Sequence, residues 1–170
     1  MTSRSHFGLP LVGWREWVAL PDFDVPFMKA KIDTGALTSS LHAFDIETFE
    51  RGGREMVRFS IHPRQRSSRR EVRVEAPLVD RRVIRSSTGH EQRRLVIATT
   101  LVLREERLRV EITLTRRDAM GFRLLLGRRA LRGKFLVDPG RSFYGGTQSG
   151  RKLPPKPRRP KKKPKRDSKS

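Results

Sequence analysis

The sequence predicts an all-β protein that folds as a small closed or nearly closed barrel with one short helix. Between residues 11 and 137, short segments rich in β-branched and aromatic residues are separated by turns that contain Gly, Pro or Asp. Several segments alternate apolar and polar residues, the pattern of a strand with one buried face. The chain has 170 residues, enough for one domain around one core. A series of short strands with one short helix is typical of such a barrel.

The expected strands follow one another with short connections. They lie at residues 11–20, 27–32, 39–44, 55–61, 70–76, 82–85, 94–98, 100–103, 108–114, 124–126 and 135–137. Residues 55–61 and 70–76 show the alternation most clearly. Residues 124–126 are three leucines, a run typical of a strand buried on both faces. A glycine on either side bounds the helix expected at residues 128–132.

Two hairpins are expected in the second half of the chain. The polar segment 86–90 contains a glycine and lies between the strand signals at 82–85 and 94–98. The second hairpin turns at residues 104–107.

The charge of the chain is strongly positive and concentrated at the C-terminus. Lys and Arg total 39 against 18 Asp and Glu, a formal net charge of +21. Residues 151–170 hold 11 Lys and Arg, one Asp and five prolines. Such a segment buries too little apolar surface to offset the entropy of ordering it. We therefore expect a flexible N-terminus at residues 1–10, a barrel domain at 11–146 and a disordered Lys/Arg/Pro-rich tail at 147–170.

Several classes of protein are disfavoured by what the sequence lacks. There is no cysteine, so disulfides and thiolate metal sites are excluded. The N-terminus has no apolar run of signal-peptide length, and no segment approaches the ~20 apolar residues that span a bilayer. Neither a phosphate-binding loop nor a zinc-binding histidine pattern occurs. The expectation is a cytoplasmic protein without cofactor or metal.

One aspartate stands at the end of an expected strand, directly before a glycine-containing turn. The strand at residues 27–32 leads into Asp33, Thr34, Gly35 and Ala36. Asp33 could cap this turn through its own side chain, as aspartates in turns often do. It could also be one half of a catalytic site. The tripeptide Asp-Thr-Gly is too short to decide between the two roles.

Three motifs, taken in order, resemble those of the retropepsin-like aspartic proteases. They are DTGA at residues 33–36, RSSTGH at 85–90 and LLLGRRAL at 124–131. In that family they correspond to the active-site loop, a glycine-bearing flap hairpin, and two apolar residues with a glycine before a short helix. Residues 11–145 more narrowly resemble a bacterial RimB-like family labelled as ATP-dependent zinc proteases and linked to RimK-type glutamate ligases. The resemblance implies an acid-protease barrel.

The resemblance also implies an aspartic endopeptidase with Asp33 as its catalytic residue. This chemistry needs a water between two carboxylates that share one proton. The chain has one Asp-Thr-Gly and is too small for a two-lobed enzyme, so a C2 homodimer is expected to supply the second carboxylate. In the family Thr34 would hydrogen-bond across that dimer. The implied supporting residues are Thr34, Gly35 and Ala36 in the loop, Arg85, Ser86, Ser87, Thr88, Gly89 and His90 in the flap, and Leu125, Leu126 and Gly127 behind the site.

The substrate and two alternative functions stay open at this point. Excess arginine and the link to glutamate ligases favour an acidic or glutamate-rich peptide substrate. The first alternative is an inactive β-barrel module that binds RNA, the ribosome or an acidic protein through its basic surface and tail. The second is a metal-dependent protease, as the older family label states, although the sequence shows neither an ATP-binding loop nor a zinc pattern.

Overall fold

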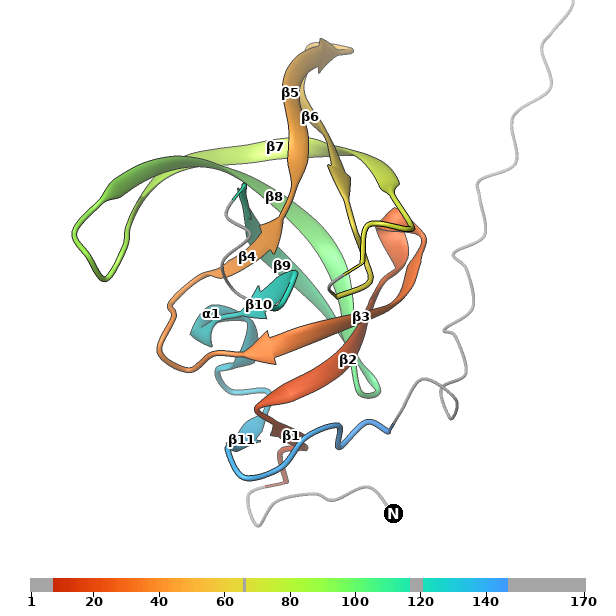
Figure 1. Cartoon of the computed structure of the whole chain (residues 1–170), viewed down its shortest axis with the longest axis vertical. Helices are drawn as coiled ribbons and strands as arrows, with labels where there is room; N and C mark the ends of the chain where they lie inside the picture. Colours follow the sequence, from red (N-terminus) through yellow and green to blue (C-terminus); the bar gives the residue numbers. More distant parts are fainter. Residues whose placement is uncertain (1–7, 66, 117–120, 147–170) are drawn as a thin grey trace, which may run out of the picture.

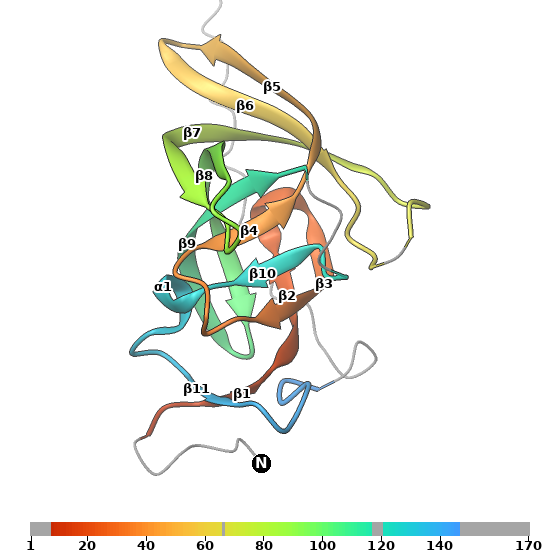
Figure 2. The same cartoon turned by 60° about the vertical axis from the view of Figure 1, so that its left-hand side comes forward.

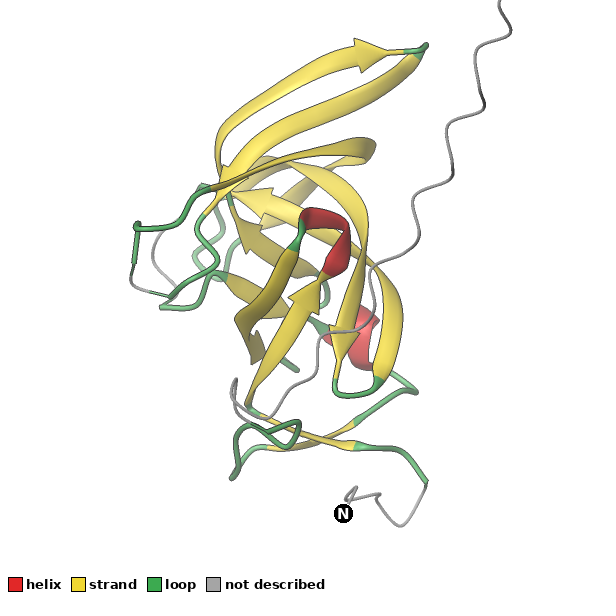
Figure 3. Ribbon diagram, turned by 90° about the vertical axis from the view of Figure 1, so that its right-hand side faces the viewer, coloured by secondary structure: helices red, strands yellow, loops and turns green. Residues whose placement is uncertain are grey.

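The computed structural model describes residues 8–65, 67–116 and 121–146, and most of these residues lie in strands (Figures 1 and 3). The all-β prediction is confirmed. The strands are β1 (Leu11–Gly13), β2 (Arg15–Leu20), β3 (Val25–Ile32), β4 (Ser39–His42), β5 (Phe44–Arg51), β6 (Arg54–Ile61), β7 (Val72–Arg85), β8 (Glu91–Leu103), β9 (Glu106–Thr115), β10 (Leu124–Leu126) and β11 (Leu136–Asp138). The helices are the short 3-10 helix η1 (Pro21–Phe23) and α1 (Arg128–Leu131).

Nine strands form one sheet that closes on itself. Its order is β2-β3-β10-β4-β9-β8-β7-β6-β5, and β2 also pairs with β8. The ring therefore consists of β2, β3, β10, β4, β9 and β8, while β7, β6 and β5 extend beyond it as a curved arm (Figure 1). The strands β1 and β11 pair in parallel as a separate ribbon below the barrel. Leu20, Met28, Leu41, Ile97 and Leu124 are among the fully buried side chains of the single core.

The short strand β10 has an unusual place, because it lies between β3 and β4 although it follows them by more than 80 residues. It runs parallel to β3 and antiparallel to β4. All three of its leucines are buried, as the sequence predicted. The insertion brings the end of β3, the start of β4 and the start of α1 to one point.

The strand boundaries differ from the predicted ones where polar or proline residues interrupt the apolar pattern. β7 is one strand rather than two, and Pro77 lies where β7 stops pairing with β6 and begins to pair with β8. β8 is likewise continuous through the buried Thr99. The first predicted strand is divided at Trp14, whose N–H donates to the carbonyl of Arg141 (2.9 Å). β5 was not predicted, because this edge strand is mostly exposed and has little hydrophobic alternation.

The predictions for the tail at residues 147–170, and for residues 1–7 of the N-terminus, concern residues outside the described ranges. In the described residues, neither helix is long and apolar enough to cross a membrane.

A buried carboxylate joins the C-terminal segment to the barrel. Glu16 on β2 is fully buried, and its oxygens accept the N–H groups of Gly13 (2.8 Å), Tyr144 (2.9 Å) and Gly145 (3.3 Å). A buried charge is tolerated only when it is hydrogen-bonded in this way. Glu16 therefore holds residues 144–145 against the bend between β1 and β2.

We expect Glu16→Ala to lower the free energy of unfolding by about 3 kcal/mol, because it leaves three backbone donors without their acceptor. Urea unfolding followed by circular dichroism measures the change. The matched control is Glu50→Ala, which removes an exposed carboxylate from β5 and should cost little. Equal losses for the two variants would contradict this role of Glu16.

A second carboxylate fastens the same segment and gives it a pH dependence. Asp138 accepts the hydroxyl of Tyr144 (2.5 Å) and the N–H of Gly140 (2.9 Å). The hydrogen bond from Tyr144, followed by the one from Gly140, lowers the pKa of Asp138, and Asp138 raises the pKa of Tyr144. A lowered carboxyl pKa stabilises the fold above the unfolded value of about 4, and this contribution is lost as the pH falls through the folded value.

Tyr144→Phe should therefore lower the melting temperature most at neutral pH. The difference from the unmodified chain should shrink below about pH 4, as Asp138 becomes protonated. It should also shrink above about pH 10, because the raised pKa of Tyr144 stabilises the fold only until the phenol ionises. Thermal unfolding across this pH range tests both limits. A difference that stays constant with pH would show that the pair does not couple to stability.

Candidate active site

The loop at residues 33–38 connects β3 to β4 and carries the Asp-Thr-Gly segment. Asp33 extends the ladder of β3 by one residue, because its N–H donates to the carbonyl of Leu126 (2.8 Å). The next residues turn sharply, and the chain enters β4 at Ser39. The backbone of Asp33 is thus fixed by the strand β3 that precedes it and by its hydrogen bond to the neighbouring strand β10.

The carboxylate of Asp33 is held by its own loop. Its Oδ1 accepts the N–H groups of Gly35 (2.9 Å) and Ala36 (3.2 Å). A Cβ on Gly35 would lie 3.2 Å from the same oxygen, so a side chain there would crowd the carboxylate. The turn-capping role considered for Asp33 is therefore present. It uses one oxygen, and within the described part of the chain no group hydrogen-bonds to Oδ2.

The segment that begins at Gly127 packs directly against this loop. A Cβ on Gly127 would lie 2.5 Å from the carbonyl oxygen of Thr38, a distance that only glycine can accept. The N–H of Gly127 donates to the hydroxyl of the buried Ser39 (3.1 Å). The N–H groups of Arg128 and Arg129 donate to the carbonyls of Ala36 (2.8 Å) and Leu37 (3.1 Å). Gly127 therefore lies directly against the 33–38 loop.

Two contributors to this site were not among the predicted residues. Arg128 reaches back from α1 and donates through Nη1 to the carbonyl of Thr34 (2.9 Å). The hydroxyl of Ser39 accepts a hydrogen bond from the N–H of Gly127, and the carbonyl of Ser39 accepts one from the hydroxyl of Thr113 (3.1 Å). Arg128 follows the glycine of the third motif, which is a weak signal, and nothing in the sequence singles out Ser39.

The hairpin predicted at residues 86–90 is confirmed and joins β7 to β8. Its tip is closed by bonds between Ser86 and His90 (N–H to carbonyl, 2.8 Å) and between Gly89 and Ser86 (3.0 Å). Gly89 has a φ of 83°, which suits glycine at this turn. An ion pair between Arg85 and Glu91 (2.8 Å) links the two strands just below the tip.

This hairpin and the 33–38 loop lie on the same side of the barrel, with the tip projecting outward beyond α1 (Figures 1 and 2). Among the described residues, no hydrogen bond or ion pair joins the 86–90 tip to the 33–38 loop. The structure therefore brings Asp33, Gly35, Ala36 and Gly127 together and leaves the tip apart. Leu125 and Leu126 are buried behind the loop.

In the described ranges, no group of three or more His, Asp or Glu side chains is placed to hold a metal ion. His42 lies at the far end of β4 beside Arg123 (Nδ1 to Nη1, 3.3 Å), and His62 stacks on Phe44 with ring centroids 4.6 Å apart.

A small β-barrel that presents Asp-Thr-Gly on a loop braced by a glycine-led helix has the organisation of a retropepsin-like aspartic-protease fold. Residues 11–148 match the family described as retropepsin-like aspartic endopeptidase RimB, and the chain belongs to this family. The family resemblance inferred from the three motifs is thereby confirmed.

Curated relatives carry a different functional name. The chain is 47% identical over 139 residues to a probable alpha-L-glutamate ligase of Shewanella halifaxensis, covering 82% of this chain and 30% of that protein. It is 44% identical over 129 residues to a protein of the same name from Desulfotalea psychrophila, covering 76% and 28%. The chain thus spans less than a third of the length of these relatives.

A solved structure shares the fold. The crystal structure of protein Lpg0085 from Legionella pneumophila, described as having unknown function, superposes with a TM-score of 0.67 at 27% identity. The match covers 79% of this chain and 97% of that one.

Proposed function

We propose that the protein is an aspartic endopeptidase that acts as a homodimer, with Asp33 of each chain facing its copy across a two-fold axis. The observation that carries the proposal is the state of the Asp33 carboxylate. Oδ1 is fixed by Gly35 and Ala36, while Oδ2 has no hydrogen-bond partner in the described residues. A carboxylate oriented by backbone N–H groups, with one oxygen free, is prepared to bind and polarise a water.

A second copy of Asp33 would complete this chemistry. Two carboxylates in contact hold one proton between them, because like charges so close cannot both ionise. The ionised carboxylate takes a proton from the water, the water oxygen attacks the peptide carbonyl carbon, and the protonated carboxyl donates toward the carbonyl oxygen. Collapse of the tetrahedral intermediate breaks the C–N bond, and the proton is delivered to the leaving amine. Thr34 is exposed on the loop, which is compatible with a hydrogen bond to the second chain.

The hairpin segment at residues 85–90 is the proposed flap. It is exposed and projects on the side of the 33–38 loop, which suits a segment that folds over a bound peptide (Figure 2). The hydroxyls of Ser86 and Thr88 and the ring of His90 are its polar groups for substrate contact.

We further propose that the substrate is an acidic peptide rich in glutamate. Residues 1–150 carry 28 Lys and Arg against 17 Asp and Glu, so the chain outside the tail is itself strongly basic. The relatives named as glutamate ligases contain a region similar to this chain, and such a ligase makes glutamyl bonds that an endopeptidase could cleave. The basic tail would attract the same polyanion.

The dependence of activity on chain concentration tests the dimer. Activity per chain on a fluorogenic oligoglutamate peptide should rise with concentration and level off where sedimentation shows a dimer. A chain that cleaves while monomeric at every concentration would contradict the shared dyad. Inhibition by a pepstatin-type compound and insensitivity to chelators are expected. Loss of activity on chelation would instead favour the metal-dependent alternative.

A binding module without activity is the second candidate, and the +10 net charge of residues 151–170 favours it. It predicts salt-sensitive RNA binding that is unchanged by substitution of Asp33, with no cleavage of any peptide.

A further inference from the structure

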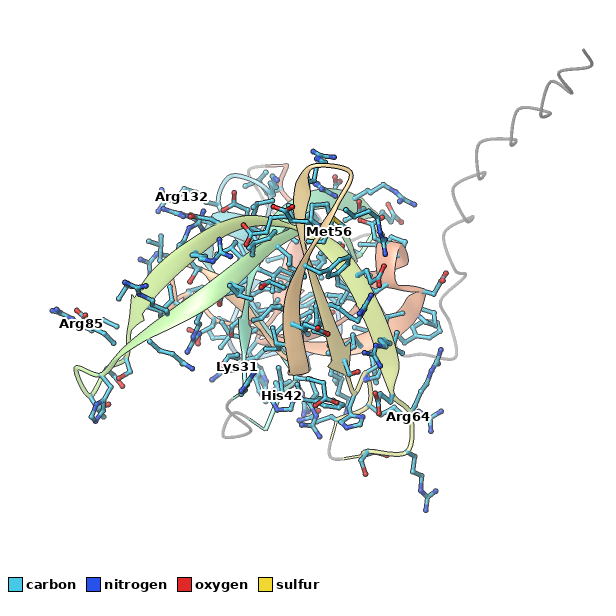
Figure 4. All side chains as sticks on the ribbon, turned by 90° about the horizontal axis from the view of Figure 1, so that it is seen from above. Lys31, His42, Met56, Arg64, Arg85 and Arg132 are labelled. Carbon is cyan, nitrogen blue, oxygen red and sulfur yellow. The ribbon has the colours of Figure 1, made fainter. Side chains whose placement is uncertain are left out.

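Three cations line the outer face of β2 and β3, next to the candidate catalytic loop. Arg15, Lys29 and Lys31 alternate with the buried residues Glu16 and Ala30, so their side chains point away from the core. Arg15 is directly opposite Lys31 in the strand register, and Lys29 is opposite Trp17. We call Arg15, Lys29 and Lys31 the cation strip. Lys31 reaches outward from the barrel in Figure 4.

The cation strip leads to the Asp33 carboxylate. Asp33 follows Lys31 by two residues and still belongs to the strand ladder through its bond to Leu126 (2.8 Å). Side chains two apart on a strand emerge on the same face, about 6.7 Å from one another. Lys29, Lys31 and Asp33 therefore stand in one row, and Asp33 is the end that would perform the chemistry.

Some cations of the described residues pair with acids, whereas those of the strip do not. On the arm, Arg51 and Arg58 pair with Glu75 at 2.8 and 2.7 Å. At the strip, no carboxylate of the described residues lies within ion-pair distance of Arg15, Lys29 or Lys31. The one nearby acid, Glu16, is buried and uses its oxygens on backbone N–H groups.

The strip also carries an uncompensated repulsion. Arg15 and Lys31 are like charges directly opposite each other on one face of an antiparallel pair, an arrangement that destabilises a sheet. A bound carboxylate would remove this cost. The opposed like charges also fit an anionic ligand.

Aromatic rings contact two cations of the strip, Arg15 and Lys29, without neutralising them. The guanidinium of Arg15 lies over Trp14 (4.6 Å) and Phe143 (5.0 Å), and the ammonium of Lys29 lies over Trp17 (5.2 Å). These contacts restrict the long side chains, which lowers the entropy lost when they bind a ligand. Their charges remain available.

We propose that the cation strip binds the acidic side chains of the substrate on one side of the cleaved bond. Lys29 and Lys31 are two residues apart on a strand, as are alternate side chains of an extended peptide. The two lysines can therefore bind the carboxylates of two glutamates that are separated by one residue. This inference takes the acidic peptide substrate from the proposed function, and it assigns Arg15, Lys29 and Lys31 as the residues that select this substrate.

Measuring both binding and cleavage of one peptide tests the cation strip separately from the proposed peptidase function. Fluorescein-labelled octaglutamate is titrated by anisotropy into Asp33→Asn, which cannot cleave it, and into the same chain carrying Lys31→Glu or Arg15→Glu in addition. Each strip substitution should weaken binding about tenfold at low salt, with the loss diminishing as added salt screens the charges. The matched control is Arg54→Glu, an equal change of charge at the exposed turn between β5 and β6.

Each outcome has one reading. Weaker binding in the strip variants but not in Arg54→Glu supports the strip. Equal losses in all three would mean that only net charge matters, and unchanged binding would mean that the peptide lies elsewhere; either result overturns the inference. If the otherwise unmodified chain cleaves the peptide while the strip variants bind it normally, the proposed function stands and the strip fails. If no cleavage occurs but binding depends on the strip, the strip stands and the peptidase does not.

Discussion

Asp33→Asn is expected to abolish peptide hydrolysis, by about a thousandfold or more, while the barrel stays folded. The amide oxygen can still accept the N–H groups of Gly35 and Ala36, so the loop keeps its internal bonds. The amide cannot take a proton from water, however, and the variant homodimer has no carboxyl group left at the site to act as base or acid. Hydrolysis of an oligoglutamate peptide and thermal unfolding measure the two effects. A folded variant that cleaves as well as the parent would exclude the aspartic mechanism.

The same variant distinguishes a shared site from a site within one chain. If subunits exchange freely, mixing with about a threefold excess of Asp33→Asn leaves only about a quarter of the active chains paired with one another. Activity should fall to about that fraction. Unchanged activity in the mixture, with exchange verified by labelled chains, would place a complete site in a single subunit.

Gly127→Ala should disrupt the site and the fold together. The new methyl group would lie 2.5 Å from the carbonyl oxygen of Thr38 and 2.6 Å from its carbon, so the backbone of the 33–38 loop must move. Overpacking of this kind costs about 1–3 kcal/mol or more. Because the loop also positions Asp33, we expect most of the activity to be lost even at temperatures where the variant is folded.

The matched control for this substitution is Gly140→Ala. Its methyl group would meet only a side-chain oxygen, that of Asp138 at 3.3 Å, which can shift. Urea unfolding should show a small loss for Gly140→Ala and a large one for Gly127→Ala. Activity that survives in a folded Gly127→Ala chain would mean that the loop tolerates the displacement.

Much of the fold could be predicted because its strands bury one face. β6 and β9 show the alternation that burial requires, and β10 is uniformly apolar because it is covered on both sides. β5 could not be found in this way, since its residues project mostly into solvent and its partner is β6 alone. The sequence pattern divides β7 into strands at 70–76 and 82–85, whereas the structure has one strand with a bulge between Leu78 and Asp80, next to the point where it changes neighbours.

The candidate site was predictable where a motif had to satisfy backbone geometry. Gly127 and the loop from Asp33 to Ala36 meet because only glycine permits the close approach of their backbones. Ser39 and Arg128 support the same loop through single side-chain bonds, which many residues at many positions could supply. The cation strip depends on strand register, since Arg15 and Lys31 are 16 residues apart and become neighbours only when β2 pairs with β3.

The position of β10 affects the order in which parts of the fold form as the chain is synthesised. The bond from Arg128 to Thr34 spans 94 residues, and the one from Gly127 to Ser39 spans 88. Such distant pairings close late in folding, because the entropy of a long loop must be lost before any contact compensates for it. A nascent chain that ends before β10 can form the β5–β6 and β7–β8 hairpins while Asp33 lacks its bond to Leu126 and the support of Gly127 and α1. The 33–38 loop therefore acquires the bonds that position Asp33 only after β10 and α1 have been synthesised.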